Sequence, residues 1–72
     1  MNDNEKLVDK KAVEFYALTF EAKALLTEID AMKAKNAERA ALNEPPAYGE
    51  IDFMQLAVKM KRVSDKLREL LA

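Results

Sequence analysis

The side chains that could carry out chemistry in this 72-residue chain are carboxylates, amines and guanidinium groups, because the sequence contains no His and no Cys. Without these two residue types, the chain lacks the usual general bases, nucleophile pairs and transition-metal ligands. Ser64 has no histidine to activate it, and the single glycine cannot supply the spaced glycines of a phosphate-binding loop. The sequence therefore predicts a protein that is not an enzyme and that holds no cofactor and no metal.

The most regular row of charge is acidic. Glu14, Glu21 and Glu28 recur every seven residues, which places them along one side of a helix. Helical di-metal sites combine glutamate with histidine three residues later, a pattern that a chain without histidine cannot build. We interpret the row as a solvated flank. In an antiparallel hairpin it would lie opposite Lys59 and Lys66, and such surface pairs influence orientation without holding an assembly together.

A basic row occupies one side of the C-terminal segment, at Lys59, Arg62 and Lys66. Clustered cations are the electrostatic signal of nucleic-acid binding, so a dimeric, helical nucleic-acid-binding regulator is the alternative function. Acidic residues interrupt the row, no aromatic side chain is interleaved for base stacking, and the whole chain has a net charge of −1. We favour the interpretation that the row is a solvated helix face.

The elements that position these side chains are predicted to be helices. Half of the residues are apolar and 35% are charged, with one Gly and two Pro, a composition typical of long helices and coiled coils. Asn2 and Glu5 have the spacing of a capping box, and no helix-breaking residue follows until the paired prolines. We expect a helix over about residues 3–42, a loop over about residues 43–52 and a second helix over about residues 53–71.

The start of the second helix has local signals of its own. Asp52 has the position of an N-cap, and Gln55 would complete a capping box three residues later. Ile51 and Leu56 have the spacing of a hydrophobic staple. We also expect Tyr48 and Ile51 to hold the loop against the end of the hairpin.

Each predicted helix carries an apolar stripe with the spacings of three and four residues that coiled coils use. The sequence therefore predicts an all-α fold: a single domain over residues 1–72, folded as a long antiparallel helical hairpin whose first helix is about twice as long as the second. The seam of the hairpin is predicted to comprise Val8, Phe15, Leu18, Ala22, Leu25, Ile29 and Met32 from the first helix and Phe53, Leu56, Met60, Val63, Leu67 and Leu70 from the second.

A second apolar stripe lies on the opposite side of the first helix. If both helices start at the loop, the shorter one reaches about half way along the longer one, and the N-terminal half is left without a partner. Exposed large side chains there would forgo on the order of 1.5 to 3 kcal/mol each. We expect this stripe to mediate self-association into a homodimer or higher assembly with a four-helix-bundle or coiled-coil core. It consists of Val13, Tyr16, Ala17, Phe20 and Ala24.

The sequence leaves three points open. A bend near Lys33 to Asn36 would give a three-helix protomer that buries the second stripe itself. If the stripe belongs to a different protein, the free chain would be a marginal monomer that orders on binding. Met54 and Val58 either form a small docking patch or are ordinary exposed apolar residues.

The function that we expect is therefore a non-enzymatic helical protein–protein interaction module, acting as a small regulator, inhibitor or assembly adaptor. Its expected partners are a second copy of itself and another protein. No stretch of about 18 uninterrupted apolar residues is present, so we expect no membrane partner. The lack of Cys and of a leader-like N-terminus leads us to expect a cytoplasmic location.

Overall fold

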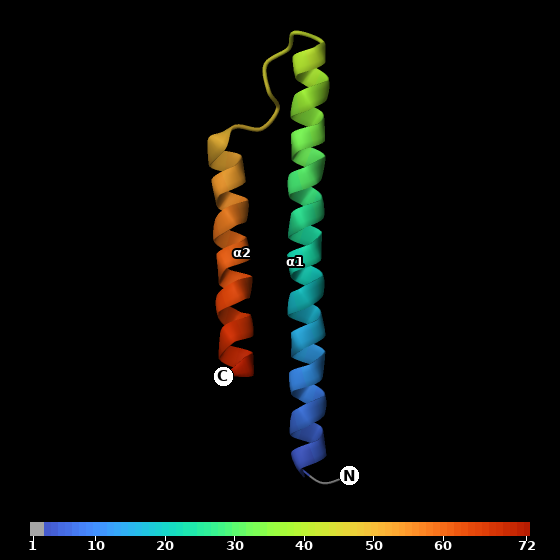
Figure 1. Cartoon of the computed structure of the whole chain (residues 1–72), viewed down its shortest axis with the longest axis vertical. Helices are drawn as coiled ribbons and strands as arrows, with labels where there is room; N and C mark the ends of the chain where they lie inside the picture. The colour runs from blue at the N-terminus through green and yellow to red at the C-terminus, as the bar shows by residue number, and fades with distance from the viewer. Residues whose placement is uncertain (1–2) are drawn as a thin grey trace.

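The computed structural model describes the backbone of residues 3–72 and the side chains of residues 10–72. Two helices, α1 over Asp3–Ala41 and α2 over Glu50–Leu71, lie antiparallel and form a hairpin 62 Å long (Figure 1). No residue of the described chain lies in a strand. The predicted all-α hairpin is confirmed, although α2, with 22 residues against 39 in α1, is longer than expected.

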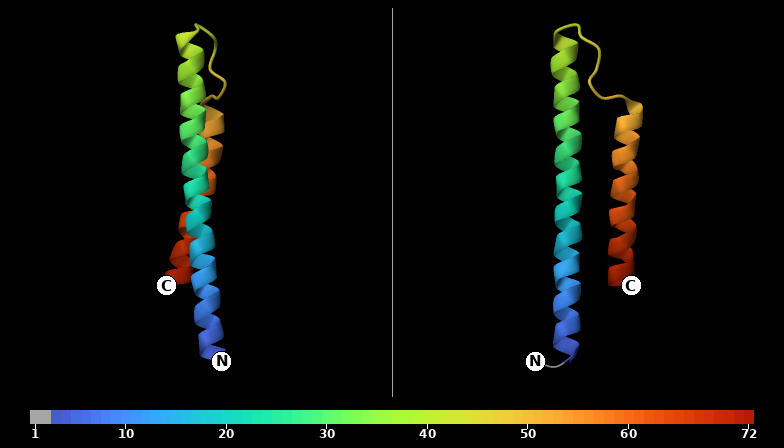
Figure 2. Two further views of the ribbon diagram at one scale, coloured as in Figure 1. Left: turned by 90° about the vertical axis from the view of Figure 1, so that its right-hand side faces the viewer. Right: turned by 180° about the vertical axis from the view of Figure 1, so that it is seen from behind.

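The long helix α1 is continuous and straight (Figure 2), so the alternative with a bend near Lys33 to Asn36 is wrong. Asn36 was the residue in this stretch that could weaken the helix, because an asparagine side chain competes for backbone hydrogen bonds. Here its amide is used elsewhere. It donates to the Tyr48 carbonyl oxygen at 2.8 Å and accepts from the Tyr48 backbone N–H at 3.0 Å.

The C-terminal end of α1 is closed by two backbone hydrogen bonds of the Schellman type. The Glu44 N–H donates to the Arg39 carbonyl oxygen at 2.8 Å, and the Asn43 N–H donates to the Ala40 carbonyl oxygen at 3.1 Å. Asn43 adopts a left-handed conformation with φ of 56°, which asparagine tolerates better than most residues. The helix therefore ends at Ala41, one residue before the expected boundary.

The helix α2 begins at Glu50, three residues earlier than expected, and the predicted N-cap at Asp52 is wrong. Gly49 is the N-cap, in an extended conformation, and Asp52 occupies the third helical position, where its carboxylate accepts from the Gly49 N–H at 2.9 Å. Asp52 therefore takes the role that was assigned to Gln55. Ile51 is 72% exposed, so it neither staples onto Leu56 nor holds the loop against the hairpin.

The loop between the helices runs back along α1 before α2 begins (Figure 1). The two hydrogen bonds between Asn36 and the Tyr48 backbone fix this course, so Tyr48 does hold the loop, through its main chain. As a result α2 is displaced toward the N-terminus of α1, and its last residues reach Lys11, Ala12 and Phe15. The expectation that the N-terminal half of α1 has no partner in its own chain is wrong for the side that faces α2.

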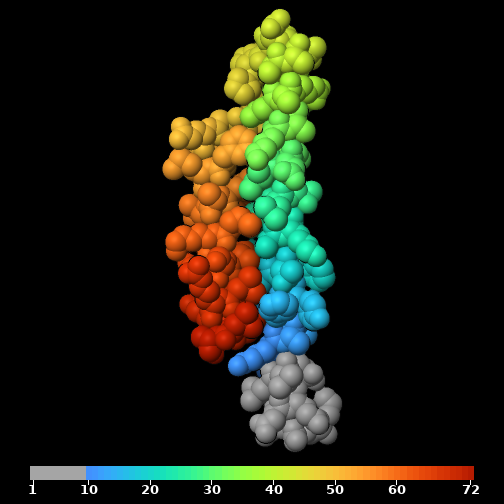
Figure 3. All heavy atoms as spheres, viewed as in Figure 1, coloured from blue at the N-terminus to red at the C-terminus, as the bar shows by residue number. Residues whose placement is uncertain are grey.

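The core is a single seam between the two helices, whose side chains are in close contact along α2 (Figure 3). Among the described side chains, the buried residues are Leu18, Leu25, Met32, Leu56 and Val63, and Ala22, Ile29, Phe53, Met60, Leu67 and Leu70 pack against them half-buried. These residues confirm the heptad stripes on both helices. Phe15 is an exception, since it is 38% exposed at the end of the seam, and Val8 lies outside the described side chains.

Candidate self-association surface

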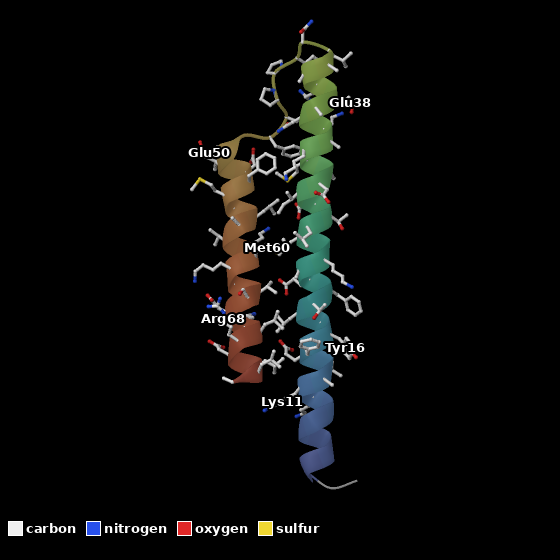
Figure 4. The ribbon with its side chains drawn as sticks, in the orientation of Figure 1. Lys11, Tyr16, Glu38, Glu50, Met60 and Arg68 are labelled. Carbon is white, nitrogen blue, oxygen red and sulfur yellow. The ribbon has the colours of Figure 1, made fainter. Side chains whose placement is uncertain are left out.

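The surface predicted to mediate self-association is exposed on the side of α1 that faces away from α2. We call Val13, Tyr16, Ala17, Phe20 and Ala24 the outward stripe. Val13, Tyr16 and Phe20 are 68%, 59% and 64% exposed, and both alanines are exposed as well. At about 100° per residue, the centre of the stripe lies roughly 150° around α1 from the seam. Figure 4 shows Tyr16 on this side of the helix, whereas Met60 lies between the helices.

Neighbouring side chains arrange the aromatic rings of this region without covering them. The Phe15 and Tyr16 rings meet edge to face, with centroids 5.8 Å apart. The Lys23 ammonium lies 5.9 Å from the centroid of the Phe20 ring, a contact worth roughly 0.5 to 1 kcal/mol at an exposed site. Because both contacts are within α1, they leave the outward stripe as a preformed apolar surface.

An apolar groove adjoins the outward stripe at the C-terminal end of α2. Its volume is about 400 Å³, and it is lined by Lys11, Ala12, Phe15, Tyr16, Leu70 and Leu71. Lys11 supplies its one cation, beneath the end of α2 (Figure 4). Leu70 belongs to the seam and Tyr16 to the outward stripe, so the groove connects the two apolar surfaces. The sequence pattern did not reveal it, because it depends on where α2 ends beside α1.

The broad side of the hairpin opposite the apolar groove is charged. Glu14, Lys66, Glu69 and Leu70 line a shallow depression there, which shows that the acidic row of α1 and the basic row of α2 face the same side. Among the described side chains, however, ion pairs within 4 Å form only inside single helices, at Lys35–Glu38 and Lys61–Asp65. The expected pairing of the glutamate row with Lys59 and Lys66 is therefore not formed.

The basic row of Lys59, Arg62 and Lys66 is exposed on α2. Because Glu14 and Glu69 line the same depression as Lys66, the acidic side chains reduce the positive potential that a polyanion would meet. Nucleic-acid binding stays a prediction, and no feature of the described surface strengthens it.

A smaller apolar patch lies on the outer face of α2. Ile51, Met54 and Val58 are 72%, 58% and 68% exposed, at spacings of three and four residues that place them on one side of the helix. Ile51 joins the two residues that the sequence suggested, because α2 starts before it rather than after it. This patch faces away from α1, so it is separate from the outward stripe.

The described residues include no group of three or more His, Cys, Asp or Glu side chains placed to hold a metal ion. Neither helix of the described chain has an apolar stretch long enough to cross a membrane. Comparisons with protein-family models, curated proteins and solved structures find no match to this chain.

Proposed function

We propose that this chain is a non-enzymatic helical interaction module that self-associates through the outward stripe and acts as a small regulator, inhibitor or assembly adaptor. One observation carries the proposal: Val13, Tyr16 and Phe20, three large apolar side chains on one side of α1, are each more than half exposed. Exposed apolar residues are common singly, but a contiguous stripe of them on a helix marks an interaction site.

The small core makes this exposure energetically important. The buried set among the described side chains is limited to two leucines from α1, one from α2, a methionine and a valine. A single core in a chain of this length rarely contributes more than about 3 to 5 kcal/mol of net stability. Burying the three exposed side chains would contribute on the order of 1 kcal/mol or more each, which is a large fraction of that total.

A second copy is the simplest partner, because two-fold dimers are by far the commonest soluble oligomers and need only one self-complementary surface. The remaining outer face of α2 stays free in such a dimer and is available to another protein, as an adaptor or inhibitor requires. A chain without cysteine is suited to a reducing compartment, and we place this function in the cytoplasm.

Two valine substitutions test the proposal with a matched control. Val13 and Val58 are both helical and both 68% exposed, but only Val13 belongs to the outward stripe. A charge buried in an interface is costly, so Val13→Glu is expected to shift the mass measured by light scattering at micromolar concentration from dimer to monomer. Val58→Glu is expected to leave the dimer mass unchanged.

Circular dichroism on both variants checks that the helices persist. A wild-type mass of one chain at micromolar concentration would end the self-association proposal. A dimer that survives Val13→Glu but not Val58→Glu would place the interface on α2 instead.

A further inference from the structure

The exposed surface of α1 continues beyond the outward stripe as a complete heptad seam. Its positions alternate spacings of four and three residues over three heptads, the pattern of a two-stranded coiled coil. We call it the outer seam, and it comprises Val13, Ala17, Phe20, Ala24, Thr27, Ala31 and Ala34. All seven residues are exposed in the protomer. It spans roughly 33 Å at 1.5 Å per residue, so a partner has a long, narrow surface to cover.

The outer seam has clear limits and no unsatisfied polar group. The next heptad positions are charged, Lys10 before the seam and Glu38 after it. The one hydroxyl inside it belongs to Thr27, and it donates to the Lys23 carbonyl oxygen at 3.0 Å. Because that hydroxyl is already hydrogen-bonded within α1, burying Thr27 would present only its methyl group and would leave no polar atom without a partner.

The flanking charges discriminate between the two orientations that a second copy could adopt. In a parallel, in-register coiled coil, a flanking residue that precedes a seam position in one chain meets the flanking residue five positions later in the other chain. Lys23 would then meet Glu28 of the second copy, and Asp30 would meet Lys35, each twice by symmetry. All four contacts are attractive.

An antiparallel pair cannot match all seven positions of the outer seam. In the register that places residue 13 opposite residue 31, Lys10 faces Ala34 and like charges come together. Glu21 would then face its own copy, as would Lys23, and Glu14 would face Glu28. In the register one heptad further along, Glu38 faces Val13, Glu14 meets Lys35 and Lys23 meets Asp30, but Glu21 still meets Glu28. Either antiparallel register therefore brings a charged side chain against the apolar seam, which carries a desolvation penalty that the parallel pair avoids. Each exposed contact is weak, so these charges select orientation while apolar burial supplies the affinity.

We propose that two copies associate as a parallel, in-register coiled coil of their α1 helices through the outer seam. This inference rests on the proposed function and specifies its geometry. Ala17, Ala24 and Ala31 recur every seven residues, so the two α1 backbones can approach closely and let Phe20 of each chain pack against its counterpart. The outer seam lies roughly 150° around α1 from the seam that packs against α2, so each α2 lies on the outside of the dimer. Because the two chains are parallel, both loops lie at the same end.

Single cysteines test the orientation, because the natural chain has none. In the proposed dimer, residue 31 of one chain faces residue 31 of the other, so Ala31→Cys and, as a second position, Ala34→Cys are expected to form disulfide-linked dimers under mild oxidation. Pairing raises the local thiol concentration from micromolar to about millimolar, so linkage should be roughly a hundredfold or more faster than for the exposed control Ala57→Cys on α2.

A mixture of Val13→Cys and Ala31→Cys chains tests the antiparallel arrangement directly. In the antiparallel register with Lys10 opposite Ala34 these two positions are opposite each other, whereas in the parallel pair they are roughly 27 Å apart, far beyond disulfide reach. Light scattering on the reduced variants is recorded first. A monomer would overturn both the proposed function and this geometry. A dimer in which residues 13 and 31 cross-link, or in which residues 31 and 34 do not self-link, would overturn the parallel pairing and leave self-association standing.

Discussion

Replacing Phe20 with alanine is expected to weaken self-association without unfolding the protomer. Phe20 is 64% exposed, and the Lys23 ammonium that lies near its ring belongs to an exposed side chain as well. Alanine also has the higher intrinsic helix propensity. The isolated hairpin of the Phe20→Ala variant should therefore keep its free energy of unfolding to within about 0.5 kcal/mol, as surface substitutions usually do.

The magnitude of the effect on dimerisation follows from the exposed fraction. Full burial of a phenylalanine side chain is worth about 1.5 to 3 kcal/mol, and 64% of this side chain is still accessible in the protomer. Each copy would therefore lose about 1 to 2 kcal/mol of association free energy, and the dimer about 2 to 4 kcal/mol. At 1.4 kcal/mol per factor of ten, the dissociation constant should rise roughly 30- to 1,000-fold.

Sedimentation equilibrium over a range of protein concentrations measures this change directly. Met54→Ala is the matched control, because Met54 is similarly exposed, at 58%, but lies on the outer face of α2. It is expected to change the dissociation constant by less than about twofold. The reasoning is refuted if Phe20→Ala leaves the dissociation constant unchanged while the helical content is retained, or if Met54→Ala weakens the dimer equally.

Two further substitutions test the hairpin itself. Leu25 is 7% exposed and its neighbour Leu26 is 51% exposed, so Leu25→Ala should lower the free energy of unfolding by about 2 kcal/mol or more in urea titrations, and Leu26→Ala by much less. Similar losses of stability for both variants would contradict the assignment of Leu25 to the seam between α1 and α2. Asn36→Ala removes both hydrogen bonds to the Tyr48 backbone and should cost about 1 to 2 kcal/mol, with faster amide exchange at Tyr48. Unchanged exchange there would show that the loop is held in another way.

The parts of the fold that sequence could predict are those that depend on neighbours along the chain. Leu18, Leu25 and Met32 recur every seven residues, and a helix places such residues on one side whatever lies elsewhere. The same regularity identified the inner stripe of α2 and the exposure of Val13 and Phe20 on the far side of α1.

The predictions that were wrong depended on contacts that the pattern does not encode. Asp52 is equally suited to the N-cap and to the third helical position. In the structure its carboxylate accepts a hydrogen bond from the Gly49 N–H, which fixes it at the third position. The extent to which α2 covers α1 depends on the loop, whose course is set by Asn36 binding Tyr48 twelve residues away. A chain that turned directly back at the prolines would have left Phe15 without α2 beside it.

The position of α2 changes the physical reason for the proposed association. Sequence alone suggested that half of α1 lacks a partner, whereas the structure shows that α2 already covers one side of that half, at Leu18, and leaves Phe20 exposed on the other. The two seams therefore share one helix. Ordering α1 through either seam lowers the entropy that must be lost to form the other, so the proposed dimerisation would be coupled to hairpin formation. Binding that occurs only in the folded state raises stability with the logarithm of concentration, so the proposed dimer would add to the free energy of unfolding that the small core supplies.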